Sequence, residues 1–546
     1  MASKREERNP HIIIIGCGVS GIASGVALKR QLGFDNFTIY EKSSGVGGTW
    51  RFSTYPGCAA DIPGHWYSLS SDLKPDWPTY YPTQPEVLAY WEDLWRKHDL
   101  PRNTVLNTSV VESEWDASRE LYYVKVKNEN TGETETVEAH FLIYGLGGFM
   151  APQYPKEMTS LAGLNFGDFK GPVWHSATWK HDVDLRNKRV AVIGNGCSGA
   201  QIVPALSEDP SITVVNFIRS AQWLVPRNNF RYRSITKWIF EHIPFVMRWH
   251  RNLIMARADV EFLIFRESNR RMREMARKAS GLTSYIKAKA PEALWDKLTP
   301  QYPVGAKQII VDPDYLSSFN RPNVLLEDTP IASLVENGIK LQNGEIVPVD
   351  IVVFATGYSL EPENLAIKGI NGKTIRQYFD EQGGPTAYLG CNFPGFPNLC
   401  YIIGPNAATG HASLLFDMEA QIRLAVQLAK PIIEGQAHSI TISKAVTDEY
   451  NKWLQDRIAT SVWPACESYY YVNGTRNTKN IAIFPGPATL FWWKARKPKW
   501  EEWEVRGGKA EQWKTSVKGW KQTRVLGISA LVAGVMAWLI YWDVAI

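Results

Sequence analysis

The chain has 546 residues, of which 45% are apolar and 21% are charged, and its six cysteines show no metal-binding or disulfide spacing. These proportions indicate a globular protein of two or three domains and exclude fibrous and low-complexity chains. The net charge of +5 gathers in residues 494–524, so the near-neutral remainder offers no footprint for nucleic acid, and we expect neither a nucleic-acid partner nor a metal site.

The first predicted element is an apolar strand, Ile12–Ile15, that enters a glycine-rich turn with G-x-G-x-x-G spacing. Such a turn lets the backbone approach a pyrophosphate at the start of a helix. A second strand, Phe37–Tyr40, ends before an acidic residue, which suits a ribose hydroxyl. We therefore predict a site for an adenine dinucleotide without a 2′-phosphate, FAD, bound by Gly16, Gly18, Gly21 and Glu41.

A second turn of the same type follows the predicted strand Val190–Ile193. Here the next strand, Val214–Ile218, ends before a basic residue, and a guanidinium suits a 2′-phosphate. The sequence therefore predicts a second dinucleotide, NADPH, bound by Gly194, Gly196, Gly199 and Arg219. Two such turns with opposite charges twenty residues on indicate redox chemistry.

The remaining patterns predict the domain organisation. An FAD-binding domain occupies residues 1–150 and 346–490, and an NADPH-binding domain at 151–345 is inserted into it, with a helical insertion at about 228–295. The fold class is α/β with two Rossmann-like domains.

Beyond the body, residues 491–524 form a basic, tryptophan-rich segment that we expect to be a linker. Residues 525–542 are uncharged and mostly apolar, and as a helix they would span about 27 Å. We predict a single-pass C-terminal membrane anchor with the body facing the cytoplasm, for example at the endoplasmic reticulum. An apolar helix that docks on the catalytic body, or that lies in the membrane interface, is the alternative.

At this point the chain resembles the class B flavoprotein monooxygenases, and within them the type I Baeyer–Villiger monooxygenases. One fingerprint of that family is matched by Phe169, Gly171, His175 and Trp179, although Lys180 stands where the family usually has Pro or Asp. A second signature is matched by Gly47, Gly48, Thr49 and Trp50, followed by Tyr55, Pro56, Gly57 and Asp61.

The resemblance implies that NADPH reduces FAD, that the flavin combines with O2 as a C4a-peroxyflavin, and that this peroxide converts a ketone to an ester or lactone. It further implies a flavin site with Gly48, Thr49, Trp50 and Tyr67, and an active-site aspartate at Asp61. For Asp61 the alternative is a carboxylate that caps a loop. His175, Asn406 and His411 are weaker candidates, for which structural roles stay open.

The chain departs from the family where a catalytic arginine is expected, because that position holds Gln308. The neighbouring Lys307, with Arg219 and Ser220, resembles the family's ligands for the 2′-phosphate. Glutamine carries no charge and cannot stabilise a peroxide anion as guanidinium does. Three readings stay open: Lys307 or Arg227 supplies the charge; a protonated hydroperoxyflavin oxidises nitrogen, sulfur or electron-rich carbon; or oxygenation is altered or lost.

The expected function is oxygenation of a small lipophilic ketone in secondary metabolism, with O2 as co-substrate. The alternatives are an N- or S-hydroxylating flavin monooxygenase and, from another class, a membrane-held flavoprotein without turnover.

Overall fold

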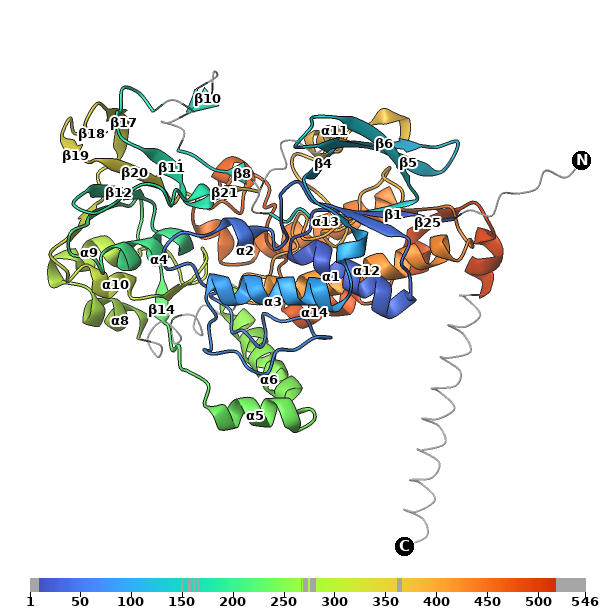
Figure 1. Cartoon of the computed structure of the whole chain (residues 1–546), viewed down its shortest axis with the longest axis horizontal. Coiled ribbons are helices and arrows are strands. Elements are labelled where there is room, and N and C mark those ends of the chain that lie inside the picture. Colours follow the sequence, from blue (N-terminus) through green and yellow to red (C-terminus); the bar gives the residue numbers. More distant parts are fainter. Residues whose placement is uncertain are drawn as a thin grey trace, which may run out of the picture.

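The computed structural model describes residues 9–148, 151–155, 159–160, 163–164, 166–266, 268, 274, 281–360 and 366–516. Two five-stranded parallel sheets organise this part of the chain, which has an α/β fold (Figure 1). Each sheet has an apolar strand at or near its centre that runs into one of the two glycine-rich turns. Parallel strands buried on both faces are expected to read as continuous apolar runs, and these do.

The first sheet has the order β23-β7-β1-β2-β3. Its central strand, β1 (Ile12–Ile15), consists of four isoleucines and is fully buried. The glycine turn leads from β1 into α1 (Val19–Ala27). The outer strand β23 follows all the strands of the second sheet in the sequence. The other strands are β2 (Phe37–Tyr40), β3 (Thr104–Val105), β7 (Phe141–Tyr144) and β23 (Leu399–Tyr401).

The second sheet has the order β11-β20-β12-β13-β16 and is also parallel. Its central strand, β12 (Arg189–Ile193), leads through the second glycine turn into α4 (Cys197–Leu206). The strand β20 (Ile351–Phe354) lies beside β12 and is buried throughout. The remaining strands are β11 (Val173–His175), β13 (Thr213–Phe217) and β16 (Val324–Glu327).

Smaller elements cover the two sheets. An antiparallel sheet pairs β22 (Ile367–Lys368), β4 (Thr108–Asp116), β5 (Leu121–Asn128) and β6 (Thr134–Ala139), and a second one pairs β17 (Ile331–Val335), β18 (Gly338–Leu341) and β19 (Ile346–Pro348). The helix α3 (Gln84–Lys97) begins with a capping box made by Thr83 and Glu86. Trp91 on its inner face is fully buried in the core around α1.

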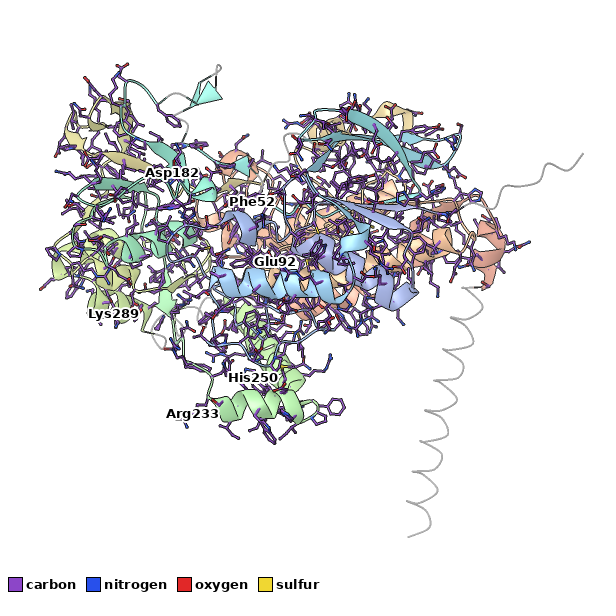
Figure 2. The ribbon with its side chains drawn as sticks, viewed as in Figure 1. Phe52, Glu92, Asp182, Arg233, His250 and Lys289 are labelled. Carbon is purple, nitrogen blue, oxygen red and sulfur yellow. The ribbon has the colours of Figure 1, made fainter. Side chains whose placement is uncertain are left out.

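Helices occupy much of the stretch 234–298. They are α5 (Ser234–His242), α6 (Val246–Glu261), the 3-10 turn η5 (Phe262–Phe265), α8 (Leu282–Lys289) and α9 (Trp295–Leu298). The pair α5 and α6 projects below the rest of the molecule in Figure 1, where Figure 2 marks it by Arg233 and His250. The inner side of the pair is fixed by the buried ion pair between Arg251 and Glu419, at 3.0 Å.

The segment after residue 490 is folded as far as residue 516, although the sequence predicted a linker there. The helix α14 (Ala488–Ala495) packs on α12 (Leu414–Ile433). The strand β25 (Trp503–Arg506) pairs with β24 (Ser439–Ile442), which precedes α13 (Lys444–Ala459). The reason is the apolar area that the tryptophans bring, since Trp503 is buried in the core around α12.

We correct the predicted membrane localisation. Among the described residues, no helix combines the length and the apolar character needed to cross a bilayer. The longest described helix, α12, has 20 residues but carries Asp417, Glu419, Arg423 and Lys430. The predicted anchor, 525–542, lies outside the described residues, so a C-terminal apolar helix finds no support.

Candidate functional site

A cavity of about 2570 Å³ lies at the carboxyl ends of both parallel sheets, and both glycine turns line it. Ligands of open α/β sheets bind at this edge. Pockets for a single small ligand enclose roughly 300–1,000 Å³. The volume is therefore larger than a pocket for one small ligand requires.

The first turn has the geometry of a pyrophosphate cradle. Gly16 has φ of +90°, which favours glycine, and a side chain on Gly21 would bring its Cβ to 1.8 Å from the carbonyl oxygen of Gly16. A Cβ on Gly18 would lie 3.3 Å from the Cα of Gly48, which comes from the second signature. The backbone of the two motifs thus meets closely at the cavity, and this fits a dinucleotide.

Glu41 is held at the mouth of this turn. The N–H of Cys17 donates to Glu41 Oε2 at 2.7 Å, and the N–H and hydroxyl of Ser43 donate to Oε1 at 2.9 and 2.8 Å. The carboxylate lines the cavity although its side chain is largely buried. The structure thus places the predicted ribose ligand, Glu41, in the lining of the cavity beside the first turn.

The second turn differs in one respect. Gly194 has φ of +112°, and a Cβ on Gly199 would lie 2.2 Å from the carbonyl oxygen of Gly194, so both positions require glycine to close the turn. Gly196 has an ordinary φ of −70°, and a Cβ there would meet nothing within 4 Å. Since Gly196 lines the cavity, its missing side chain leaves room for a ligand.

Three residues outside this turn, Arg219, Ser220 and Lys307, lie close to one another in the lining of the cavity. The Nζ of Lys307 donates to the hydroxyl of Ser220 at 3.3 Å, and Arg219 lines the same wall of the cavity. Burial lowers the pKa of Lys307, and the charge of Arg219 lowers it further. Two cations and a hydroxyl on one wall fit a phosphate group.

The second signature places an aromatic pair beside Asp61. The Nε1 of Trp50 donates to the hydroxyl of Tyr67 at 3.0 Å, with the rings edge to face at 5.6 Å. Gly48 lies at the N-terminus of the short helix α2 (Thr49–Phe52). Burial raises the pKa of Tyr67 to about 12, and burial also raises the pKa of Asp61, against the opposing effect of Arg227.

The structure brings Asp61, Lys307 and Gln308 to the wall of one cavity. Gln308 Oε1 accepts from the hydroxyl of Tyr470 at 3.5 Å. Arg227 is not part of the described lining, and its guanidinium lies over the ring of Tyr81 at 5.7 Å. Its charge nevertheless lowers the pKa of Asp61, in opposition to burial.

Two weaker candidates, His175 and Asn406, are buried and form hydrogen bonds within the fold. His175, in β11, is buried, accepts the N–H of Ala177 on Nδ1 at 3.1 Å, and has its pKa lowered to about 4 by burial. Asn406 is buried, and its Nδ2 donates to the carbonyl of Ile483 at 3.0 Å. Neither belongs to the described lining of the cavity, whereas His411 does.

Sequence reasoning missed Gln201, on α4, which joins the two halves of the site. The hydroxyl of Tyr55 donates to Gln201 Oε1 at 2.9 Å, and Gln201 Nε2 donates to the carbonyl of Ala59 at 3.0 Å. The loop of the second signature is thereby tied to the helix of the second turn. A lone glutamine within a helix gives no signal for such a contact.

Comparisons with known proteins identify the family of this chain. Residues 9–365 match the family described as flavin-binding monooxygenase-like. A Baeyer–Villiger monooxygenase of Pseudomonas aeruginosa is 33% identical, with 90% of this chain and 89% of the relative covered. The FAD-binding monooxygenase ktnD of Aspergillus niger is 30% identical, over 91% of this chain and 82% of the relative.

A likeness in fold accompanies these matches. The solved structure of an oxidized steroid monooxygenase bound to NADP superposes with a TM-score of 0.76 and 24% identity, covering 91% of this chain and 99% of the other. With the family match extending over the first glycine turn, the second signature and the second turn, this chain belongs to the Baeyer–Villiger monooxygenases of the flavin-binding monooxygenase family.

Proposed function

We propose that this enzyme, an FAD- and NADPH-dependent monooxygenase, inserts one oxygen atom from O2 into a lipophilic ketone and releases an ester or lactone, in secondary metabolism. The observation that carries the proposal is the shared cavity: both glycine turns, Asp61 and the Lys307–Gln308 pair line it. A single chamber allows hydride transfer and oxygenation to take place without release of an intermediate to water.

Each turn has a proposed ligand. The first turn, with Glu41 and the loop Gly48–Trp50, binds FAD, and the second turn, with Arg219, Ser220 and Lys307, binds NADPH. When bound, the flavin would accept a hydride from NADPH and reduce O2. Residues 1–150 and 346–490 form the FAD domain in this proposal, and 151–345 form the NADPH domain.

The residues around Asp61 have positioning and electrostatic tasks. Because burial raises its pKa, Asp61 can hold a proton more readily than an exposed aspartate does. The Trp50–Tyr67 pair and the neighbouring Tyr80 and Tyr81 provide apolar walls that exclude water. Lys307 provides a positive charge in the lining of the same cavity, beside Gln308 in the sequence.

Gln308 is the specific observation that favours a second candidate function. A neutral amide stabilises an anion less than a guanidinium does, and it therefore favours chemistry in which the oxygen donor keeps its proton. Such a donor acts on amines and thioethers rather than on ketones. The second candidate is an N- or S-oxygenating flavin monooxygenase.

The two candidates are separated by product analysis. Purified holoenzyme is supplied with NADPH and ¹⁸O2 and with a panel of lipophilic ketones, amines and thioethers. The proposed function predicts an ester or lactone with one labelled oxygen, by mass spectrometry. Labelled N- or S-oxide, with peroxide alone from every ketone, contradicts it and supports the second candidate. If NADPH fails to reduce the bound FAD in the absence of air, both candidate functions are excluded.

The change Gln308→Arg is expected to preserve ketone oxygenation or to raise it by up to about tenfold, because it adds a fixed positive charge to the cavity wall. The measurement is ester formed per NADPH consumed. The matched control is Gln301→Arg, on the exposed part of the same loop, which is expected to change nothing. Loss of oxygenation with intact flavin reduction in Gln308→Arg shows that residue 308 does not face the oxygenation site.

A further inference from the structure

One wall of the cavity is mainly apolar and contains a buried imidazole. The wall comes from α6, η5 and the chain leading into α12, and its apolar members are Ile254, Ala258, Ile264, Phe265, Leu414 and Leu415. His411 lines the same wall with a side chain only 2% exposed. The rings of Phe262 and Phe265 flank it, with centroids at 5.3 and 5.8 Å.

The neighbours of His411 select the tautomer of its neutral ring. Its Nε2 lies 3.4 Å from Oδ1 of Asp259. Asp259 also accepts the N–H groups of Ala488 and Thr489, at 2.6 and 3.2 Å, at the start of α14. Burial would raise the pKa of Asp259, but these hydrogen bonds outweigh it and the pKa is lowered. A carboxylate therefore faces Nε2, and in the neutral ring Nε2 carries the proton while Nδ1 is an acceptor.

The acceptor Nδ1 has no donor among the described residues. Nδ1 of His411 is buried and has no hydrogen-bond partner among the described residues. Buried polar atoms are normally paired, so an orphan at the wall of a cavity points to a ligand.

The loop that carries His411 is anchored to α12 by a hydrogen bond. The hydroxyl of Thr409 donates to Oδ2 of Asp417 at 2.9 Å, and Asp417 is completely buried. This anchor and the contact with Asp259 hold the imidazole from two sides, so Nδ1 is kept in place for a group that enters the cavity.

The other charged groups on this wall are already engaged with one another. Arg257 and Glu261, one turn apart on α6, form an ion pair at 3.6 Å, and both side chains are exposed. Among the described residues that line this wall, Nδ1 of His411 is therefore the buried polar atom that lacks a partner, and most of its neighbours are apolar.

We infer that His411 binds a hydroxyl group of the substrate through Nδ1, and that the substrate is a lipophilic ketone bearing a hydroxyl. The ketone part of this inference rests on the proposed function; the hydroxyl part rests on His411 alone. The hydroxyl donates to Nδ1 while the hydrocarbon part packs against Phe265 and the aliphatic residues of the wall. His411 is thus a specificity-determining residue, oriented by Asp259.

The test measures binding without turnover. Holoenzyme with FAD, but without NADPH, is titrated with three matched lipophilic ketones that carry a hydroxyl, a methoxy group or hydrogen at one position, and flavin absorbance reports the dissociation constant. The hydroxy ketone is expected to bind about tenfold more tightly than the other two, because only it donates a hydrogen bond to Nδ1.

Two variants assign the preference to His411. His411→Leu is expected to remove the preference while melting temperature and FAD content stay unchanged. His411→Asn is expected to retain it in part, since the amide oxygen can take the place of Nδ1.

Three results overturn the inference: equal binding of the three ketones, no binding of any, or an equal loss of affinity for all three in His411→Leu. The last would mean that the imidazole only fills space. If the hydroxyl preference holds but no ketone is oxygenated, the proposed function fails and the role of His411 stands.

Discussion

Gly196→Ala is expected to leave the protein folded and yellow with FAD but to raise the KM for NADPH by about 100-fold. The φ of −70° suits alanine, and the new methyl group meets no protein atom within 4 Å. Its only cost is the space it takes from the cavity, where the second turn would hold a pyrophosphate. Anaerobic flavin reduction, followed against NADPH concentration, measures the effect.

The neighbouring glycine is the matched comparison. In Gly199→Ala the methyl group would lie 2.2 Å from the carbonyl oxygen of Gly194, so the turn itself must move. That variant is expected to lower the melting temperature, which Gly196→Ala does not. An unchanged KM for NADPH in Gly196→Ala contradicts the assignment of the second turn to this coenzyme.

Arg219→Ala is expected to raise the KM for NADPH by about 100-fold and to leave the KM for NADH nearly unchanged. A charged contact of this kind is worth about 2.7 kcal/mol, and only NADPH carries the 2′-phosphate that makes it. Lys307, bonded to Ser220 beside it, keeps part of the preference for NADPH. Steady-state oxidation of both coenzymes gives the ratio.

Arg186→Ala is the control for this change. Arg186 belongs to the same part of the chain, just before β12, but it pairs with Asp184 at the surface, at 2.8 Å, with 71% of its side chain exposed. It is expected to alter neither KM. Equal losses for NADPH and NADH in Arg219→Ala mean that the guanidinium serves the fold and does not select the coenzyme.

The sequence predicted those features that depend on local chemistry. The strands at Ile12–Ile15 and Phe37–Tyr40 have the predicted bounds, because short runs rich in apolar, aromatic and β-branched residues favour strands. The same local order brings Glu41 and Arg219 to the cavity, since Glu41 stands directly after β2 and Arg219 stands two residues after β13.

Contacts between distant segments could not be predicted. Gln201 meets Tyr55, and Asp259 meets Ala488, across separations of 146 and 229 residues, and neither pair has a local pattern. The tryptophan-rich segment after residue 490 misled the prediction for a different reason. Its high charge indicated a linker, whereas its buried Trp503 depends on β24, which only the fold brings beside it.

The position of β23 has a consequence for synthesis on the ribosome. The strands β1, β2, β3 and β7 emerge within the first 144 residues, but the edge of β7 stays uncovered until residues 399–401 arrive. The second sheet is complete earlier, with β20 at residue 354. The unit enclosed in the middle of the chain can therefore mature first, and nascent chains that stop short of β23 present an open strand edge to other chains.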